Sequence, residues 1–240
     1  MSWCLFLDVD GTLVGLADAP DAVHVDDELR ELLDRVRDRL DGAVALVSGR
    51  QISEIDRLFA PRAWPAAGVH GLERRDALGT RHFKHVIDEG MLAIARYRLR
   101  RLAEQLPGTI FEDKGITVAL HYRQAPQHEQ RIRREMREVA RDLGGDFRVL
   151  EGRKVAELRP GGATKADAVR DFLREPPYVG RRPVFIGDDI TDEEALRAVE
   201  QLGGLSVAVG DRISGMLRVA GPRDVRALLE DVAETGTPHA

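Results

Sequence analysis

The chain has 240 residues, of which 43% are hydrophobic and 32% are charged, and its formal net charge is −5. This composition supports a buried core and excludes wholesale disorder, and the lack of a long basic run argues against nucleic acid as a partner. No apolar run approaches the ~20 residues of a membrane span. The single cysteine, Cys4, allows no intramolecular disulfide. We therefore expect a monomeric, cytoplasmic protein that binds neither nucleic acid nor membrane.

The N-terminal and C-terminal parts of the chain show the same alternation of strand and helix patterns. The first part predicts a buried strand "WCLFLDV", a helix over 29–40, a strand "AVALVSG" and a helix "RQISEIDRLF". The last part predicts a helix over 165–173, a strand "PVFIG", a helix "TDEEALRAVEQL", a strand "LSVAVG" and a helix "PRDVRALLEDVAE". Strands separated by helices indicate a parallel sheet with helices on both faces.

The middle of the chain shows a different order of predicted helices and strands. Apolar residues at helical spacing over 87–106 and 132–143 predict two helices. The stretch "ITVALHYR" alternates strictly, and "FRVLEGRKVAELRP" reads as a hairpin that turns near Gly152. This order predicts an antiparallel sheet with helices on one face and a free polar face. The fold class is therefore α/β, with a Rossmann-like parallel-sheet core over 1–83 and 160–240 and an inserted α+β domain over 84–159.

Two carboxylates stand at the end of the first strand, in "FLDVDGTLV". Asp8 and Asp10 are two residues apart, so in an extended strand both side chains point to the same side. At the carboxyl end of a parallel strand they project into the crevice where such sheets bind ligands. Their repulsion favours a divalent cation, although Asp and Gly are also common in simple turns.

Three further segments carry polar or charged residues at the ends of strands or the starts of helices. Ser48 ends the second strand before a helix, as a phosphate-binding residue or a plain N-cap would. Lys165 begins a helix, against the preference of the helix dipole, so it needs a reason to be there. Asp188 and Asp189 repeat the acidic pair at a second strand end, and Asp192 follows one turn later, where it can cap the helix.

Together these groups make a phosphoryl-transfer site. One carboxylate attacks phosphorus, and a second carboxylic acid protonates the leaving oxygen and then activates water. A lysine and a metal ion neutralise the phosphoryl oxygens. Oxygen ligands with a few waters suit Mg²⁺.

The four segments, in this order, resemble the haloacid dehalogenase superfamily of aspartate-nucleophile phosphatases. The stretches "AGVHGLERRD", "ALHYRQAP", "VAELRPGGATKADAV" and "GDDITDEEAL" resemble its trehalose-phosphatase family over nearly the whole chain. The resemblance implies a HAD-like core, with the insert as a cap domain. It also implies Mg²⁺-dependent hydrolysis of trehalose 6-phosphate through an aspartyl-phosphate, the last step of trehalose biosynthesis.

The resemblance also implies roles for individual residues. Asp8 is the nucleophile, Asp10 the general acid and base, and Ser48 and Lys165 bind the phosphoryl group. Mg²⁺ is held by Asp8, the backbone carbonyl of Asp10 and Asp188, whereas Asp189 and Asp192 support the site. The expected substrate contacts in the core are Ser48, Gly49, Arg50, His70, Gly71 and Glu73, while Arg75 and Asp76 read as an ordinary polar loop. Those expected on the polar face of the cap are Lys114, His121, Arg123, Glu157 and Arg159.

Several alternatives stay open. The family usually has Gly-Lys before the last strand of the cap, but here Gly152 is followed by Arg153 and Lys154, and either could replace that lysine. A receiver domain shares the acidic pair, but it lacks the second acidic pair and the insert. A phosphatase of sucrose 6-phosphate or of a hexose phosphate keeps the chemistry and changes the substrate. A sugar sensor with an inactive site conflicts with the intact Asp8 and Asp10.

Overall fold

The computed structural model describes residues 2–16, 23–84, 89–144, 147–152 and 154–238. The chain forms two compact units, one of Met1–Phe83 with Ala163–Ala240, and one of Lys84–Gly162. The second unit is inserted into the first along the chain. The expected insert ended at residue 159, whereas the observed unit continues through Gly162.

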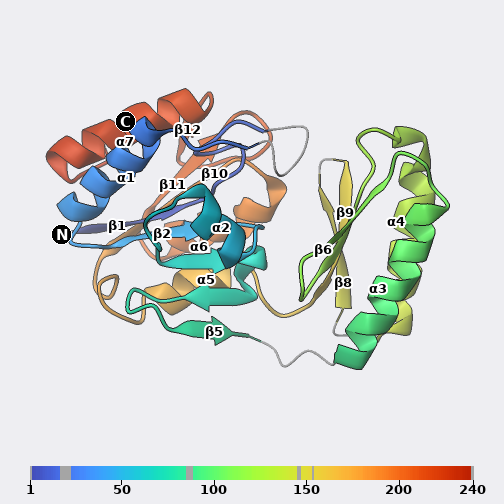
Figure 1. The fold of residues 1–240 in the computed structure, drawn as a ribbon. Helices are drawn as coiled ribbons and strands as arrows, with labels where there is room; N and C mark the ends of the chain where they lie inside the picture. The colour runs from blue at the N-terminus through green and yellow to red at the C-terminus, as the bar shows by residue number, and fades with distance from the viewer. Residues whose placement is uncertain (1, 17–22, 85–88, 145–146, 153, 239–240) are drawn as a thin grey trace. The chain divides into compact units, whose positions relative to one another are not determined.

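An eight-stranded sheet lies at the centre of the first unit, in the order β12-β11-β10-β1-β2-β3-β4-β5 (Figure 1). All neighbouring strands from β12 to β3 pair in parallel. The β3–β4 and β4–β5 pairs are antiparallel. The bounds are β1 Trp3–Leu7, β2 Val44–Val47, β3 Ala66–Gly68, β4 Glu73–Arg75, β5 Arg81–Phe83, β10 Arg182–Gly187, β11 Leu205–Val209 and β12 Leu217–Val219. Strand β1 is buried on both sides because β2 and β10 flank it, which explains its continuous apolar run.

Helices cover both faces of this sheet. Helix α1 packs against α7, and α5 packs against α6, and the two pairs lie on opposite faces (Figure 1). The helices of this unit are α1 Asp27–Arg39, α2 Ile52–Leu58, α5 Lys165–Phe172, α6 Glu193–Gln201 and α7 Pro222–Thr235, with 3₁₀ turns η2 Val69–Gly71 and η4 Ile190–Asp192. The rings of Phe6, Phe172 and Tyr178 meet at centroid distances of 5.1–5.8 Å, and this aromatic cluster fastens α5 to β1.

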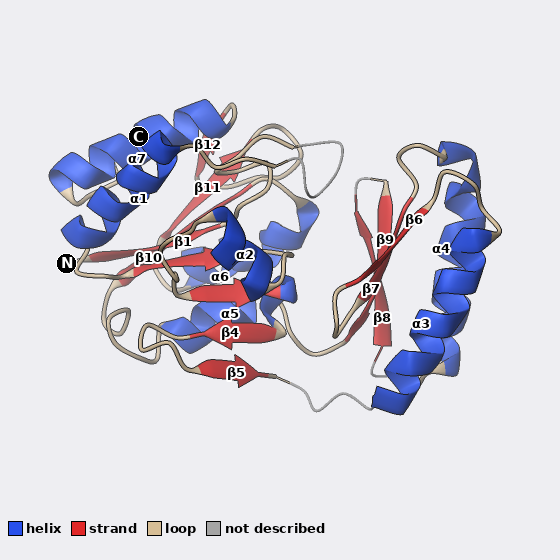
Figure 2. Ribbon diagram, viewed as in Figure 1, coloured by secondary structure: helices blue, strands red, loops and turns tan. Residues whose placement is uncertain are grey.

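The second unit is a four-stranded antiparallel sheet with two helices on one face (Figure 2). The strand order is β6-β7-β9-β8. The elements are α3 Glu89–Glu104, β6 Ile110–Asp113, β7 Val118–His121, η3 Pro126–His128, α4 Glu129–Asp142, β8 Phe147–Gly152 and β9 Val155–Pro160. Leu99 of α3 and Met136 of α4 pack on Val118, Leu120 and Leu158 of the sheet. The other sheet face carries the alternate, mostly polar residues, as the alternation in the sequence predicts.

Two findings differ from the sequence-based expectations. The short strands β3, β4, β5 and β12 were not expected. Arg75 is not part of a polar loop: it lies buried in β4, where it binds Asp56 at 2.5 and 2.8 Å and the backbone oxygen of Trp64. Ile87, expected at the start of a helix, lies outside the described residues.

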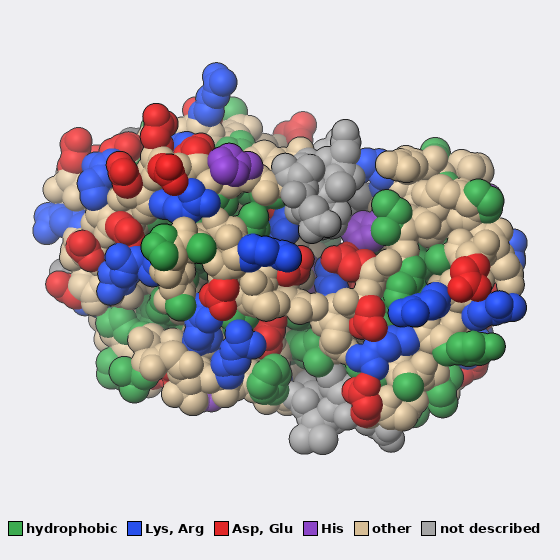
Figure 3. Space-filling model, in the orientation of Figure 1, with side chains coloured by type: hydrophobic (Ala, Val, Ile, Leu, Met, Phe, Trp, Pro, Cys, Tyr) green, Lys and Arg blue, Asp and Glu red, His purple; other side chains and the backbone are tan. Residues whose placement is uncertain are grey.

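The surface shown in Figure 3 carries both signs of charge. Acidic and basic side chains are interspersed there over both units, with apolar side chains scattered among them. A mixed surface of this kind creates no extended field of one sign. In the described parts of the chain, helices are too short or too polar to cross a bilayer.

Candidate active site

The site residues of the first unit lie at one edge of its sheet. Strand β1 is parallel to both β2 and β10, so the carboxyl ends of these three strands face the same way. Asp8 follows β1, Ser48 follows β2, and Asp188 follows β10. Strand β1 is also the point where the chain changes its direction of growth across the sheet. Ligands bind at such switch points in open α/β sheets.

Asp8 is 4% exposed, and both of its carboxylate oxygens are engaged. Oδ1 accepts a hydrogen bond from Nζ of Lys165 at 2.6 Å, and Oδ2 accepts one from the hydroxyl of Thr12 at 3.1 Å. Burial raises the pKa of Asp8 well above its usual range, and Lys165 opposes that rise. The ammonium group thus favours the carboxylate form, which is the form that can attack an electrophile.

Lys165 is held in place by the way its helix begins. Thr164 caps α5 through a reciprocal pair of hydrogen bonds with Asp167, and Lys165 is the first helical residue. Its ammonium group also binds Oδ1 of Asp192 at 2.6 Å. Burial opposes the charge of Lys165, but Asp192 and Asp8 raise its pKa above the usual range, so it stays cationic. This explains a lysine at a helix start.

Asp192 is fully buried and links Lys165 to the loop after β10. While its Oδ1 binds Lys165, its Oδ2 accepts the backbone N–H groups of Asp188 and Asp189 at 3.1 and 3.0 Å. Both oxygens are therefore committed to holding their neighbours. Asp189 in turn forms an ion pair with Arg212 at 2.5 Å. These contacts support the loop that presents Asp188.

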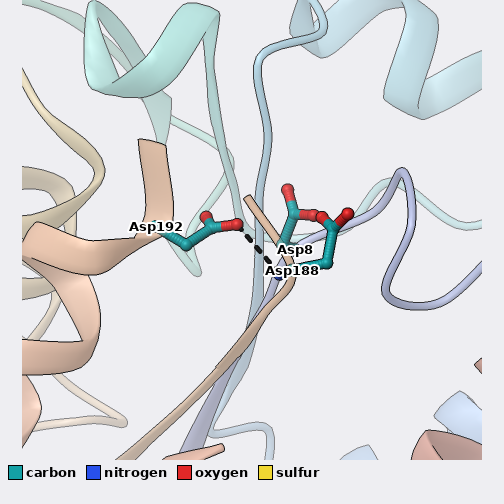
Figure 4. Close-up of side chains that lie close together, drawn as sticks. All are labelled: Asp8, Asp188 and Asp192. Carbon is teal, nitrogen blue, oxygen red and sulfur yellow. Dashed lines mark hydrogen bonds between the residues drawn. The ribbon is translucent and has the colours of Figure 1, made fainter. Parts of the chain in front are cut away.

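The carboxylates of Asp8, Asp188 and Asp192 form a cluster that could hold a metal ion (Figure 4). One oxygen of each lies within 4.8 Å of the others. Oδ1 of Asp188 is buried without a hydrogen-bond partner. A Cβ at Gly11, where φ is +86°, would lie 2.2 Å from Oδ2 of Asp188, so only glycine leaves room for this carboxylate. An orphaned buried oxygen inside a carboxylate cluster fits an oxygen-preferring divalent cation.

The charges around the cluster support the same conclusion. Burial and the neighbouring carboxylates of Asp192 and Asp189 raise the pKa of Asp188 to about 7. Five acidic side chains lie here, those of Asp8, Asp10, Asp188, Asp189 and Asp192. In the described part of the chain, the ion pairs of Asp8, Asp10, Asp189 and Asp192 involve three cations, Lys165, Arg50 and Arg212. The carboxylates outnumber the cations that pair with them, and a divalent cation would offset that excess.

Asp10 faces a different partner. Its carboxylate accepts two hydrogen bonds from Arg50, from Nε at 2.7 Å and from Nη2 at 2.8 Å. Arg50 lies in the loop after β2, and its backbone N–H binds the hydroxyl oxygen of Ser48 at 3.1 Å. The two expected phosphoryl and acid–base residues, Ser48 and Asp10, are thus joined through one arginine.

The segment 68–73 lies against both the Ser48 loop and the start of α5. The backbone N–H of His70 donates to the backbone oxygen of Ser48, and the His70 ring packs against Gly49. Gly71 has φ +97°, and a Cβ there would lie 2.4 Å from the backbone oxygen of Thr164. Glu73 is buried, and its Oε1 accepts the N–H of Ile52 at the first residue of α2. Gly71 and Glu73 therefore have clear positioning contacts.

A polar cluster occupies the helix-free sheet face of the second unit. The register places Glu112 of β6, Ala119 of β7 and Glu157 of β9 side by side. Lys114 reaches Glu157 at 3.3 Å and Glu112 at 3.8 Å, and His121 binds Glu112 at 2.7 Å. The small side chain of Ala119 separates the two glutamates. Three of the expected cap residues, Lys114, His121 and Glu157, come together here.

The two remaining expected cap residues have different positions. Arg123 is exposed just after β7, and Arg159 lies two residues after Glu157 on the same strand face. Lys154 binds Glu129 at the start of α4 at 2.9 Å and lies 6.0 Å from the ring centre of Tyr122. Lys154 is thus engaged with α4. Arg153 lies outside the described residues.

Sequence reasoning missed Glu112, Thr12 and Arg212. The glutamate gave no signal because its importance depends on the register of β6 with β7. Thr12 stands in the quoted "DVDGT" stretch, four residues after Asp8, so its spacing could have identified it. The pairing of Arg212 with Asp189 joins two loops that only the fold brings together.

The family model that matches this chain and two of its curated relatives are all described as phosphatases of trehalose phosphate. The family model described as trehalose-phosphatase matches residues 6–222. A probable trehalose-phosphate phosphatase of Sinorhizobium fredii is 43% identical over 87% of this chain and 78% of its own length. The trehalose-6-phosphate phosphatase of Escherichia coli is 42% identical over 94% of this chain and 84% of its own length.

The solved structures agree with this relationship. The crystal structure of a trehalose-6-phosphate phosphatase related protein superposes with a TM-score of 0.83 at 27% identity, covering 98% of both chains. The α/β fold, a Rossmann-like core with an inserted α+β domain, is that of the haloacid dehalogenase superfamily. The chain belongs to the trehalose-phosphatase family.

Proposed function

We propose that this chain is a Mg²⁺-dependent phosphatase that hydrolyses trehalose 6-phosphate to trehalose and phosphate, the last step of trehalose biosynthesis. The observation that carries the proposal is the buried Asp8–Lys165–Asp192 arrangement beside Asp188, in a chain of the trehalose-phosphatase family. A buried carboxylate bound by a lysine and placed beside a metal-compatible cluster suits phosphoryl transfer. The enzyme acts as a cytoplasmic monomer.

The first half of the reaction transfers the phosphoryl group to Asp8. A carboxylate oxygen of Asp8 forms a bond to phosphorus while the bond from phosphorus to the sugar oxygen breaks. Asp10 gives its proton to that leaving oxygen, which departs as the 6-hydroxyl of trehalose. The ammonium of Lys165 and the hydroxyl of Ser48 bind the phosphoryl oxygens and stabilise their charge.

The second half hydrolyses the aspartyl-phosphate. The Asp10 carboxylate, now deprotonated, takes a proton from a water molecule that attacks phosphorus. The bond between phosphorus and the Asp8 oxygen breaks, phosphate leaves, and both carboxyl groups return to their starting states. One residue thus serves as acid and then as base.

The residues that would hold the Mg²⁺ ion are Asp8 and Asp188, through their carboxylates, and Asp10, through its backbone carbonyl. The partnerless Oδ1 of Asp188 and the excess of carboxylates over paired cations support this assignment. When bound, the ion supplies positive charge that lets the anionic phosphoryl group approach the Asp8 carboxylate. Asp192 is a positioning residue, because Lys165 and two backbone N–H groups use both of its oxygens.

The helix-free face of the second unit binds the sugar part of the substrate. Glu112 and Glu157 can each accept hydrogen bonds from sugar hydroxyls, and Lys114, between them, can donate. Trehalose presents many hydroxyls, so its recognition needs several convergent polar groups. His121 orients Glu112 through its 2.7 Å contact.

The test is phosphate release from a panel of sugar phosphates with Mg²⁺ present. We expect the highest kcat/KM with trehalose 6-phosphate, and loss of activity after EDTA treatment with recovery when Mg²⁺ is restored. Faster turnover of sucrose 6-phosphate or glucose 6-phosphate would refute the substrate. Full activity in EDTA would refute the metal requirement.

A further inference from the structure

The side chain of Arg50 binds Asp10 in a two-point arrangement. Nε and Nη2 donate to the two different oxygens of the carboxylate, at 2.7 and 2.8 Å. The arginine side chain is 11% exposed and that of Asp10 is 31% exposed. A bidentate pair of this kind fixes the orientation of the carboxylate plane as well as its position.

The backbone of Arg50 is held by two hydrogen bonds, one at its N–H group and one at its oxygen. Its backbone N–H binds the hydroxyl oxygen of Ser48, and its backbone oxygen accepts the N–H of Val69. Val69 has φ +48°, an unusual backbone conformation for a β-branched residue. The backbone position from which the Arg50 side chain extends is therefore fixed by contacts to Ser48 and Val69.

We propose that Arg50 is a positioning residue that orients the Asp10 carboxyl for proton transfer to the leaving group. A general acid must lie within hydrogen-bond reach of the leaving oxygen and point a lone pair or proton at it. Asp10 lies beyond the end of β1, so the strand alone does not fix its side chain. The two hydrogen bonds from Arg50 supply that constraint, and they tie the orientation of Asp10 to the Ser48 loop.

This role differs from a direct contact of Arg50 with the phosphoryl group or the sugar. If Arg50 only orients Asp10, its loss slows the hydrolysis of esters whose leaving group must be protonated more than that of esters whose leaving group departs as a stable anion. If Arg50 binds the phosphoryl group, all phosphate esters slow alike. If Arg50 binds the sugar, esters without a sugar are unaffected.

The first experiment compares phenyl phosphate with 4-nitrophenyl phosphate in Arg50→Ala. Neither ester carries a sugar, so the comparison rests on the proposed function only for its phosphatase chemistry. The basic phenolate needs a proton as it leaves, whereas 4-nitrophenolate leaves readily without one. General acid–base catalysis supplies ~10²–10⁴-fold, so we expect kcat/KM to fall on the order of 10–100-fold for phenyl phosphate and less than about threefold for 4-nitrophenyl phosphate.

The second experiment repeats the substitution in an Asp10→Asn background. Positioning residues act through their partner, so Arg50→Ala should lower kcat/KM less than about threefold further there. Added guanidinium ion should restore part of the phenyl phosphate activity of Arg50→Ala, but none in the double variant. Arg57→Ala is the matched control, because Arg57 lies on the same loop–helix segment with its side chain 70% exposed.

Four results would overturn the proposal. Equal losses for the two aryl esters would place Arg50 on the phosphoryl group. A loss with trehalose 6-phosphate but not with phenyl phosphate would place it on the sugar. An undiminished loss in the Asp10→Asn background would show that it acts independently, and no loss at all would deny it a role. If wild type cleaves the aryl esters but not trehalose 6-phosphate, the substrate proposal fails and the Arg50 test still stands.

Discussion

Replacing Lys165 by methionine isolates the contribution of the buried charge network. The ammonium group lies 2.6 Å from Asp8 and 2.6 Å from Asp192, and all three side chains are at most 5% exposed. Methionine keeps most of the volume of lysine and removes the charge and the donors. Breaking a buried ion pair by removing one partner costs about 3–5 kcal/mol, because the remaining charge is left buried. Here two carboxylates lose the same partner.

We therefore expect Lys165→Met to lower the free energy of unfolding by at least about 3 kcal/mol when metal is removed with EDTA. Urea unfolding, followed by far-UV circular dichroism and by tryptophan fluorescence, measures this difference in the unit that contains both tryptophans, Trp3 and Trp64. Arg174→Met is the control in the same unit, since this exposed arginine pairs only at the surface with Asp171. Such a surface change should stay within about 0.5 kcal/mol.

The cause of the loss can be separated from a simple packing effect. In Lys165→Met, the added substitution Asp8→Asn removes one of the stranded charges and should restore part of the lost stability. In the otherwise native chain the same Asp8→Asn change also removes an anion that pairs with Lys165, so it should be less favourable to stability there than in Lys165→Met. A Lys165→Met loss below about 1 kcal/mol, or an Asp8→Asn effect of the same sign and size in both backgrounds, would refute the reasoning.

Four further outcomes follow from the structure. Asp8→Asn should abolish phosphate release and weaken Mg²⁺ binding in calorimetry while the fold persists; measurable turnover would contradict its role. Glu157→Ala should lower kcat/KM for trehalose 6-phosphate at least about tenfold but spare 4-nitrophenyl phosphate, and parallel losses would remove it from sugar recognition. Gly71→Ala should cost about 1–3 kcal/mol in urea unfolding, because its φ of +97° and the oxygen 2.4 Å from the new Cβ oppose any side chain; a neutral result would contradict that geometry. The hydrogen bonds of Arg226 hold the pKa of Asp26 below 3.8, so Asp26→Asn should lower the free energy of unfolding at neutral pH. This loss of stability should vanish as acid protonates the native Asp26 carboxylate, and a loss independent of pH would contradict the pairing.

Much of the fold could be predicted because long periodic segments report their own environment. The apolar run of β1 requires helices on both faces of the sheet, and the alternation in β7 requires one covered face and one polar face. The strands β3, β4 and β5 have three residues each, too few to establish a period. Their structure depends on tertiary contacts, such as the pairing of β4 with β3 and the binding of Arg75 to Asp56 of α2.

The candidate site was predictable where residues stand at strand ends, and not where contacts cross between loops. Asp8 and Asp188 converge because parallel strands end at a common edge, and Lys165 attracted notice because a helix start disfavours a lysine. The fork from Arg50 to Asp10 spans 40 residues of sequence. Its geometry depends on how the loop after β2 is held, which no local pattern encodes.

The same distinction separates the two glutamates that the sequence treated alike. Glu73 and Glu157 were both expected to contact substrate. The structure places Glu157 in the polar cluster of the second unit, beside Lys114, whereas the Glu73 carboxylate binds the first backbone N–H of α2. Since α2 follows the Ser48 loop directly, Glu73 has a structural reason to be present without touching a ligand. Only tertiary contacts distinguish the surroundings of these two glutamates.

The most direct test of the central claim is to trap the phosphoryl group on Asp8. The protein is mixed with Mg²⁺ and excess trehalose 6-phosphate, quenched in acid within one turnover, and digested for mass spectrometry. We predict that the peptide containing Asp8 gains the mass of one phosphoryl group at that residue, and that Asp8→Asn gives no adduct. Phosphate release without any adduct in rapid-quench samples, or an adduct on another residue, would contradict the account.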